Sequence, residues 1–250
     1  MTAGESDSMD LKLSKWKKSD YNAFTEYLKS KADIKYRDFQ SSLVPGMKNN
    51  YILGVRMPVL RDMGKEIAKG NPKSYLNVSS NDFYEERMLK GIVLGLIKTE
   101  SFDEFVMLCD DFVSEIDNWA ICDCFCVGLK HSIKIYKEEF FEYINKYIKS
   151  ANVWSVRLGL VIMLDYYLDS EHIDIVLDRC DSITSDFYYV SMAQAWLVAT
   201  AFAKCRDKTM LYMHNNSLND VTFNKAVQKC IESKRIDKET KDYLKSLKRY

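Results

Sequence analysis

The stretch IDNWAICDCFCVGLK, residues Ile116–Lys130, carries the pattern that decides the fold. Between Trp119 and Leu129 every residue is apolar, small or a thiol, apart from the carboxylate of Asp123. A segment that is apolar nearly all round predicts a helix covered by protein on most sides. An ionised carboxylate in such a setting costs free energy unless something compensates it, so Asp123 requires an explanation.

Other segments of the same kind recur at a fixed interval. They include YEERMLKGIVLGLI, VWSVRLGLVIML and YYVSMAQAWLVATAFA. Their aromatic residues stand 35 residues apart, with a fifth step in FNKAVQKC: Tyr84, Trp119, Trp154, Tyr189 and Asn224. Amphipathic segments such as SFDEFVMLCDDFVSEI and EEFFEYINKYIKS alternate with them, since apolar residues recur there at spacings of three and four.

The period predicts an all-α fold, a solenoid of helical hairpins. An inner helix and an amphipathic outer helix cannot bury their apolar faces alone, so neighbouring hairpins stack into an α-α superhelix with a concave groove. Asp82, Asp117 and Asn152 precede three of the inner segments and are expected to be N-caps. An irregular all-α bundle is the alternative arrangement.

The predicted domain covers most of the chain. Residues 1–10, MTAGESDSMD, are small and polar and are expected to form a disordered tail. A hydrophobic content of 47% across 250 residues is enough to bury a substantial core. We therefore expect residues 11–250 to form a single helical-repeat domain, and we expect the protein to be a monomer.

Because its charges balance, the protein has no overall electric field that would attract a nucleic acid or a membrane. Lys and Arg total 36, as do Asp and Glu, so such a partner must use a local patch. Apolar runs such as GIVLGLI and AWLVATAFA are shorter than the roughly 20 residues of a membrane span. No signal-peptide pattern opens the sequence, and we expect a cytoplasmic protein without a membrane partner.

The seven cysteines are typical of reduced, buried thiols, because their number is odd and they lie in apolar segments. Cys122, Cys124 and Cys126 form a C-x-C-x-C pattern within a predicted helix. There Cys122 and Cys126 share a face, whereas Cys124 points elsewhere, which is a poor metal geometry. We expect no metal and no other cofactor.

Two charged residues stand beside tryptophans on the inner segments. Asp123 follows Trp119 by four residues, and Arg157 follows Trp154 by three, so each charge shares a helix face with its indole. In one interpretation Asp123 and Arg157 form a buried ion pair and the tryptophans are packing residues. In the other, these groups and Trp196 line the groove, where a carboxylate beside indole faces suits a cationic ligand.

Five segments together resemble the DNA alkylation repair proteins of the AlkD type, which are bacterial alkylpurine DNA glycosylases built from HEAT-like repeats. They are LGVRMPVLRDMGKEIAK, YEERMLKGIVLG, DNWAICD, VWSVRLGLVIML and YYVSMAQAWLVA, and the resemblance runs from about Tyr51 to the C-terminus. It implies a DNA repair hydrolase that cleaves the N-glycosidic bond of cationic N3- or N7-alkylated purines in duplex DNA.

The resemblance also implies the site residues. Members of the family have a Trp and an Asp four residues apart, an Arg on the next inner helix and a second Trp in the active-site cleft, which match Trp119, Asp123, Arg157 and Trp196. Asp123 would be catalytic. Trp119 and Trp196 would pack against the lesion sugar or backbone, Arg157 would hold a phosphate, and Trp154 is a further candidate for DNA contact.

Two departures from the family pattern favour an alternative. The glycosylases carry a second Arg three residues after the second Trp, where this chain has Ala199, and an aromatic residue in the region that reads VPGMKNN here. Both departures weaken the expected binding of a damaged nucleotide. The alternative is a non-catalytic helical-repeat module that binds a DNA structure or a protein.

Overall fold

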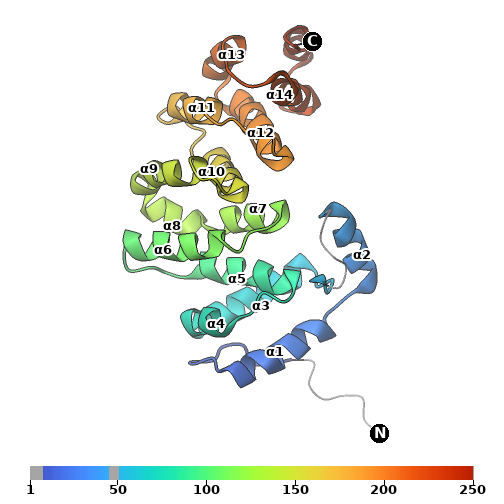
Figure 1. The fold of residues 1–250 in the computed structure, drawn as a ribbon, viewed down its shortest axis with the longest axis vertical. Helices are drawn as coiled ribbons and strands as arrows, with labels where there is room; N and C mark the ends of the chain where they lie inside the picture. The colour runs from blue at the N-terminus through green and yellow to red at the C-terminus, as the bar shows by residue number, and fades with distance from the viewer. Residues whose placement is uncertain (1–7, 45–50, 250) are drawn as a thin grey trace. The chain divides into compact units, whose positions relative to one another are not determined.

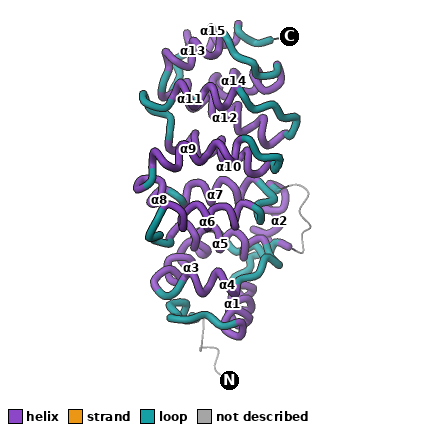
Figure 2. The backbone as a smooth tube through the Cα atoms, turned by 60° about the vertical axis from the view of Figure 1, so that its left-hand side comes forward, coloured by secondary structure: helices purple, strands orange, loops and turns teal. Residues whose placement is uncertain are grey.

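A computed structural model describes residues 8–44 and 51–249, and it is built of helices (Figures 1 and 2). These residues form fifteen helices and no strand, so the all-α prediction is confirmed. Of the predicted tail, residues 1–7 lie outside the described residues, as does most of VPGMKNN. None of the described helices combines the length and the apolar character that crossing a membrane requires.

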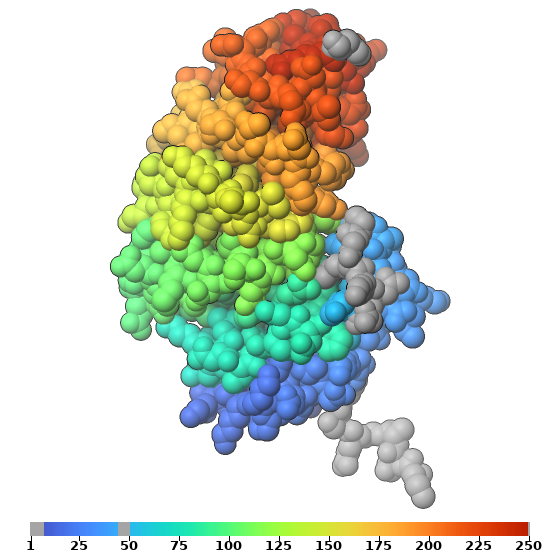
Figure 3. All heavy atoms as spheres, viewed as in Figure 1, coloured from blue at the N-terminus to red at the C-terminus, as the bar shows by residue number. Residues whose placement is uncertain are grey.

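The chain divides into two compact units, residues 1–135 and residues 136–250. In each unit, successive segments of the chain lie against one another on the face that Figure 3 shows. The single domain expected over residues 11–250 stays a prediction.

Unit 1 is a stack of helices with α3, α5 and α7 in contact in that order. Its helices are α1 (Lys18–Ser30), α2 (Ile34–Leu43), α3 (Met57–Lys69), α4 (Pro72–Val78), α5 (Tyr84–Leu96), α6 (Phe102–Val113), α7 (Trp119–Gly128) and α8 (Lys130–Ile135). The outer helix α6 packs Phe112 on Phe125 of the inner helix α7, with ring centroids 4.6 Å apart. The contacts of α3 with α5 and of α5 with α7 make the inner helices of successive hairpins neighbours, as a repeat fold requires.

Unit 2 repeats this arrangement with α10, α12 and α14 as the inner helices. Its helices are α9 (Lys137–Ile148), α10 (Val153–Tyr166), α11 (Ile173–Asp181), α12 (Tyr188–Lys204), α13 (Arg206–His214), α14 (Asp220–Glu232) and α15 (Lys238–Ser246). The outer helices α9, α13 and α15 pack on α10, α12 and α14. Residues 155–164 of α10 are all buried, which explains why that segment is apolar on every side.

The starts of the inner helices follow the 35-residue period of the sequence. The inner helices α5, α7, α10 and α12 begin at Tyr84, Trp119, Val153 and Tyr188, each within one residue of the predicted position. The fifth step, Asn224, lies inside α14. The prediction of repeated helical hairpins is confirmed.

Two of the three predicted N-caps are wrong. Asn152 does cap α10, because its side chain accepts hydrogen bonds from the N–H groups of Trp154 and Ser155. The cap of α7 is Asn118 rather than Asp117, whose carboxylate pairs with Arg87 instead.

At α5 the cap position is Phe83 rather than Asp82. Glu86 takes over the role of a capping side chain by accepting a hydrogen bond from the N–H of Phe83, at 3.1 Å. A carboxylate three residues into a helix often reaches back in this way.

Two buried carboxylates at the start of α5 fix the surrounding segments. Glu85 accepts hydrogen bonds from the backbone N–H groups of Leu53, Gly54 and Val55, at 2.9, 2.7 and 3.2 Å. Glu86 accepts from the hydroxyls of Thr25 and Ser80, at 3.1 and 2.8 Å. Gly54 has a φ of +93°, and a Cβ there would lie 2.3 Å from the Asp33 carbonyl oxygen, so this turn requires glycine.

Close backbone contact sets the spacing of α5 and α7. A Cβ on Gly95 would lie 2.7 Å from the carbonyl oxygen of Gly128, at the end of α7. Any larger residue at position 95 would push the two helices apart, because backbone atoms cannot move aside as a flexible side chain can. Glycine at this position therefore holds α7 against α5.

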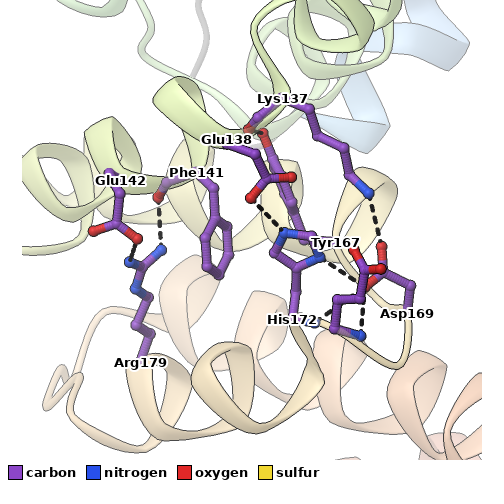
Figure 4. A network of polar contacts seen from close by, with 9 residues as sticks. Lys137, Glu138, Phe141, Glu142, Tyr167, Asp169, His172 and Arg179 are labelled. Atoms are coloured by element: carbon purple, nitrogen blue, oxygen red, sulfur yellow. Dashed lines mark hydrogen bonds and ion pairs between the residues drawn. The ribbon is translucent and has the colours of Figure 1, made fainter.

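A polar network joins α9 to α11 in unit 2 (Figure 4). The ring nitrogens of the buried His172 lie 2.7 Å from Asp169 Oδ1 and 3.2 Å from Glu138 Oε2. Lys137 Nζ donates to Asp169 Oδ2 at 3.0 Å. Burial acts to raise the pKa of Asp169, but hydrogen bonds from His172 and Lys137 outweigh it and lower that pKa to about 2.

Asp169→Asn is expected to destabilise the protein in a pH-dependent way. Because the folded pKa of Asp169 is depressed, its carboxylate stabilises the fold above its ordinary pKa of about 3.8, and this contribution is lost as the pH falls toward 2. With the side chain 37% exposed, solvent screening reduces the contribution at pH 6 to about 1 kcal/mol. Urea unfolding of parent and variant across this pH range measures it.

The matched control is Asp174→Asn, which removes an exposed carboxylate paired with Lys208. We expect a smaller effect from it, because exposed ion pairs contribute little. A difference between Asp169→Asn and the parent that stays constant down to pH 2 would contradict the assignment.

Candidate functional site

A pocket in unit 1 contains two of the predicted site residues, Trp119 and Asp123. Their four-residue spacing on α7 puts them on one face, and that face lines a pocket of about 510 Å³. The helices α3 and α5 present rows with the same spacing, and α2 adds Gln40 and Leu43. The rows are Met57, Arg61 and Lys65 on α3 and Tyr84, Met88, Ile92 and Leu96 on α5. Three stacked inner helices therefore form the pocket walls.

Hydrogen bonds fix both the start of α7, where Trp119 lies, and the indole of Trp119. Asn118 caps α7 by accepting hydrogen bonds from the N–H groups of Ala120 and Ile121, both at 3.0 Å. The indole Nε1 of Trp119 donates to the carbonyl oxygen of Leu43 at 2.9 Å. This bond ties the end of α2 to the start of α7, so Trp119 also positions one wall of the pocket.

Asp123 is half-buried among mostly apolar side chains. A carboxylate in such surroundings interacts with a cation more strongly than it would in water, because the local dielectric constant is lower. Arg61 supplies a positive charge to the same pocket. Its guanidinium is exposed and forms no ion pair or hydrogen bond with another residue of the part that the structure describes.

Two neutral polar groups complete the lining. The hydroxyl of Tyr84 accepts a hydrogen bond from Gln40 Nε2 at 3.0 Å, and burial raises the pKa of Tyr84. Burial also raises the pKa of the Cys124 thiol. Both groups therefore stay protonated at neutral pH. Sequence reasoning did not assign Arg61, Tyr84 or Cys124 to this site, although each belongs to a row with four-residue spacing.

In unit 2 the structure brings Trp154 and Arg157 together around Tyr189. Arg157 is 5% exposed, and its Nη1 donates to the carbonyl oxygen of Tyr189 at 2.7 Å. The Trp154 ring packs against Tyr189 and Phe187, with centroids 5.4 and 5.3 Å apart. These contacts attach the start of α10 to the start of α12. Asp123 and Arg157 belong to different units, so their ion pair stays a prediction.

Trp196 lies apart from that cluster and lines a second pocket, of about 580 Å³, within unit 2. It is 37% exposed. Ala199, which stands where the family pattern has an arginine, lines the same pocket. Trp154 and Arg157 are not part of its lining.

The cysteines of α7 are arranged as the helical pattern predicted. Cys122 and Cys126 are buried, whereas Cys124 faces the unit 1 pocket. Within the described ranges, His, Cys, Asp and Glu side chains form no group of three or more that could hold a metal ion.

Stacked helical hairpins with an indole and a carboxylate in one pocket of the inner helices define a helical-repeat protein. The family model of DNA alkylation repair enzymes matches residues 23–229. The chain belongs to this family, of which AlkD-type proteins are members, and the family assigns it a role in DNA repair. A search of curated proteins found no match.

Trp119→Phe is expected to loosen the end of α2. The substitution removes the N–H donor to Leu43, and a hydrogen bond of this kind contributes about 1 kcal/mol to stability. Amide hydrogen exchange should therefore accelerate at residues 41–44, and urea unfolding should show the loss. Trp154→Phe is the control, since its indole N–H donates to no described residue. Unchanged exchange at residues 41–44 would contradict the prediction.

Proposed function

We propose that the protein is a DNA glycosylase that hydrolyses the N-glycosidic bond of cationic N3- or N7-alkylated purines in duplex DNA. The observation that carries the proposal is the pairing of Asp123 with Trp119 in a mostly apolar pocket of a DNA alkylation repair family member. Among the described residues that line this pocket, Asp123 is the only one with a carboxylate.

The substrate's own charge reduces the chemistry that the protein must supply. Alkylation at N3 or N7 makes the base cationic, so it leaves as a neutral purine and needs no general acid. Positive charge then grows on the deoxyribose as the bond breaks. A fixed carboxylate stabilises this charge and orients the water that attacks the sugar carbon, as in other oxocarbenium-like reactions. Asp123 takes that role.

The rest of the pocket suits a cationic base joined to an anionic backbone. The face of the Trp119 indole attracts positive charge. Arg61, at the exposed side of the same pocket, can pair with a phosphate. In this proposal Arg157, Trp154 and Trp196 contact the DNA from unit 2, with Arg157 directed at a phosphate as the family pattern implies.

A second candidate is a non-catalytic module that binds DNA through the same helices. Ala199 favours it, because a methyl group stands where the family's glycosylases place a guanidinium. The two candidates differ in one measurable property, the release of a free base.

The deciding experiment compares parent, Asp123→Asn and Asp111→Asn for release of methylated purine from alkylated duplex DNA, with heat-inactivated protein as the blank. Asp123→Asn removes the charge but keeps the size, so excision should fall by about 10²-fold or more. Affinity for duplex DNA and the melting temperature should barely change. Asp111→Asn makes the same chemical change on the exposed side of α6 and should leave excision unchanged.

A different result would identify a structural carboxylate. If Asp123 exists to neutralise a buried Arg157, its loss would leave an uncompensated guanidinium and cost about 3–5 kcal/mol of stability. Such a loss, in a parent protein that releases no methylated base, would refute the catalytic role.

A further inference from the structure

A further pocket of unit 1, of about 720 Å³, lies where the segment before α1 crosses the turn between α3 and α4. The backbone holds this crossing together, because the N–H of Asn71 donates to the carbonyl oxygen of Leu13 at 2.8 Å. A Cβ on Gly70 would lie 2.5 Å from the same oxygen, so this close approach requires glycine. Backbone contacts therefore fix two walls of the pocket, and the end of α5 with the residues after it forms another.

Four lysines from four separate segments line this pocket, which we call the lysine pocket. Lys12 precedes α1, Lys69 ends α3, Lys73 lies in α4, and Lys98 follows α5. None of the described residues in the lining carries a carboxylate. A hollow lined by charges of one sign concentrates their field inside it. Because these ammonium groups surround one hollow instead of following one helix, they suit a compact anion better than an extended strand.

Three of the lysines form ion pairs with carboxylates outside the lining. The ammonium groups of Lys12 and Lys69 share the carboxylate of Glu66, at 3.1 and 2.5 Å, and Lys73 pairs with Glu104. The three lysine side chains are half exposed or more. Exposed ion pairs contribute little to stability, because solvent screens them. A phosphate group can therefore compete for these ammonium groups.

The fourth lysine, Lys98, is exposed and forms no ion pair or hydrogen bond with another residue of the described ranges. The charge of Glu100 acts on Lys73, but Glu100 does not line the pocket. The four lysines thus outnumber the three carboxylates of Glu66, Glu100 and Glu104. The lysine pocket keeps a positive charge that can attract an anion from solution.

The neutral polar groups of the lining can also donate hydrogen bonds. Asn71 uses its Oδ1 to accept from the N–H of Ser74, so its Nδ2 is left as a donor. Neither this Nδ2 nor the hydroxyl of Ser14 forms a hydrogen bond with a described residue. Ammonium, amide and hydroxyl donors match the acceptor oxygens of phosphate. The described lining residues include no aromatic side chain on which a nucleobase could stack.

We propose that the lysine pocket binds a compact oligophosphate, a chain of adjacent phosphoryl groups such as tripolyphosphate or the triphosphate of a nucleotide. Adjacent phosphoryl groups can engage ammonium groups from several segments at once, whereas a single phosphate cannot. The volume of the pocket lies in the range of small-molecule sites. Of the described residues, only Leu96 lines both this pocket and that of Asp123. The inference requires neither DNA nor base excision, so it goes beyond the proposed function.

The test is isothermal titration calorimetry of the full-length protein with sodium tripolyphosphate at low salt. Lys73→Gln with Lys98→Gln removes two of the four ammonium groups, so the affinity for tripolyphosphate should fall about tenfold or more. Inorganic phosphate should bind the parent more weakly than tripolyphosphate does. Adenosine triphosphate should bind with an affinity similar to that of tripolyphosphate, because the lining offers no surface for the base.

The control is Lys29→Gln with Lys245→Gln, which removes the same charge from two exposed lysines paired with Glu26 and Asp242. Its affinity for tripolyphosphate should match that of the parent. Melting temperatures without ligand establish that both double variants are folded.

Four results would overturn the proposal. The first is a parent protein that does not bind tripolyphosphate, and the second is a pocket variant that binds it as the parent does. The third is an equal loss of affinity in the control, which would indicate unspecific charge attraction. The fourth is displacement of bound tripolyphosphate by a short undamaged duplex, since the lysines would then belong to a DNA-binding surface.

Discussion

The fold of unit 1 depends on two carboxylates that never reach solvent. Glu85 and Glu86 occupy the first turn of α5, where the positive end of the helix dipole favours negative charge. Burial raises the pKa of Glu85, and the three backbone N–H donors from Leu53, Gly54 and Val55 oppose that effect. Glu86 reaches α1 through Thr25. Because the turn at Gly54 leads directly into α3, the hydrogen bonds of Glu85 hold the start of α3 against the start of α5.

The pocket follows from that arrangement together with the contact of Gly95 with Gly128. Once α3, α5 and α7 are fixed at helix-packing distance, each presents a row of side chains at four-residue spacing to the same space. Most of these side chains are apolar, so the few charges among them act in a low dielectric. The position of Asp123 is thus a product of backbone packing as much as of its own helix.

The features that depend on local periodicity could be predicted from the sequence, whereas most long-range contacts could not. The 35-residue interval located the inner helices, and the spacing of Trp119 and Asp123 placed both on one face, because these properties depend on neighbours along one helix. Arg61 was missed because its place in the pocket depends on how α3 packs against α5. Asp117 and Asp82 resemble N-caps locally, but Arg87 pairs with the first and Glu86 displaces the second. The pocket beside Trp196 is lined by residues of both α12 and α14, so no single segment indicates it.

The thiol of Cys124 lies in the same pocket as Asp123 and Trp119. Agents that alkylate purines are electrophiles, and they also attack cysteine, whose thiolate is the reactive form. Burial raises the pKa of Cys124, which lowers the thiolate fraction at neutral pH. The apolar walls that strengthen the electrostatic interactions of Asp123 thus also lower the fraction of Cys124 that is in the reactive thiolate form.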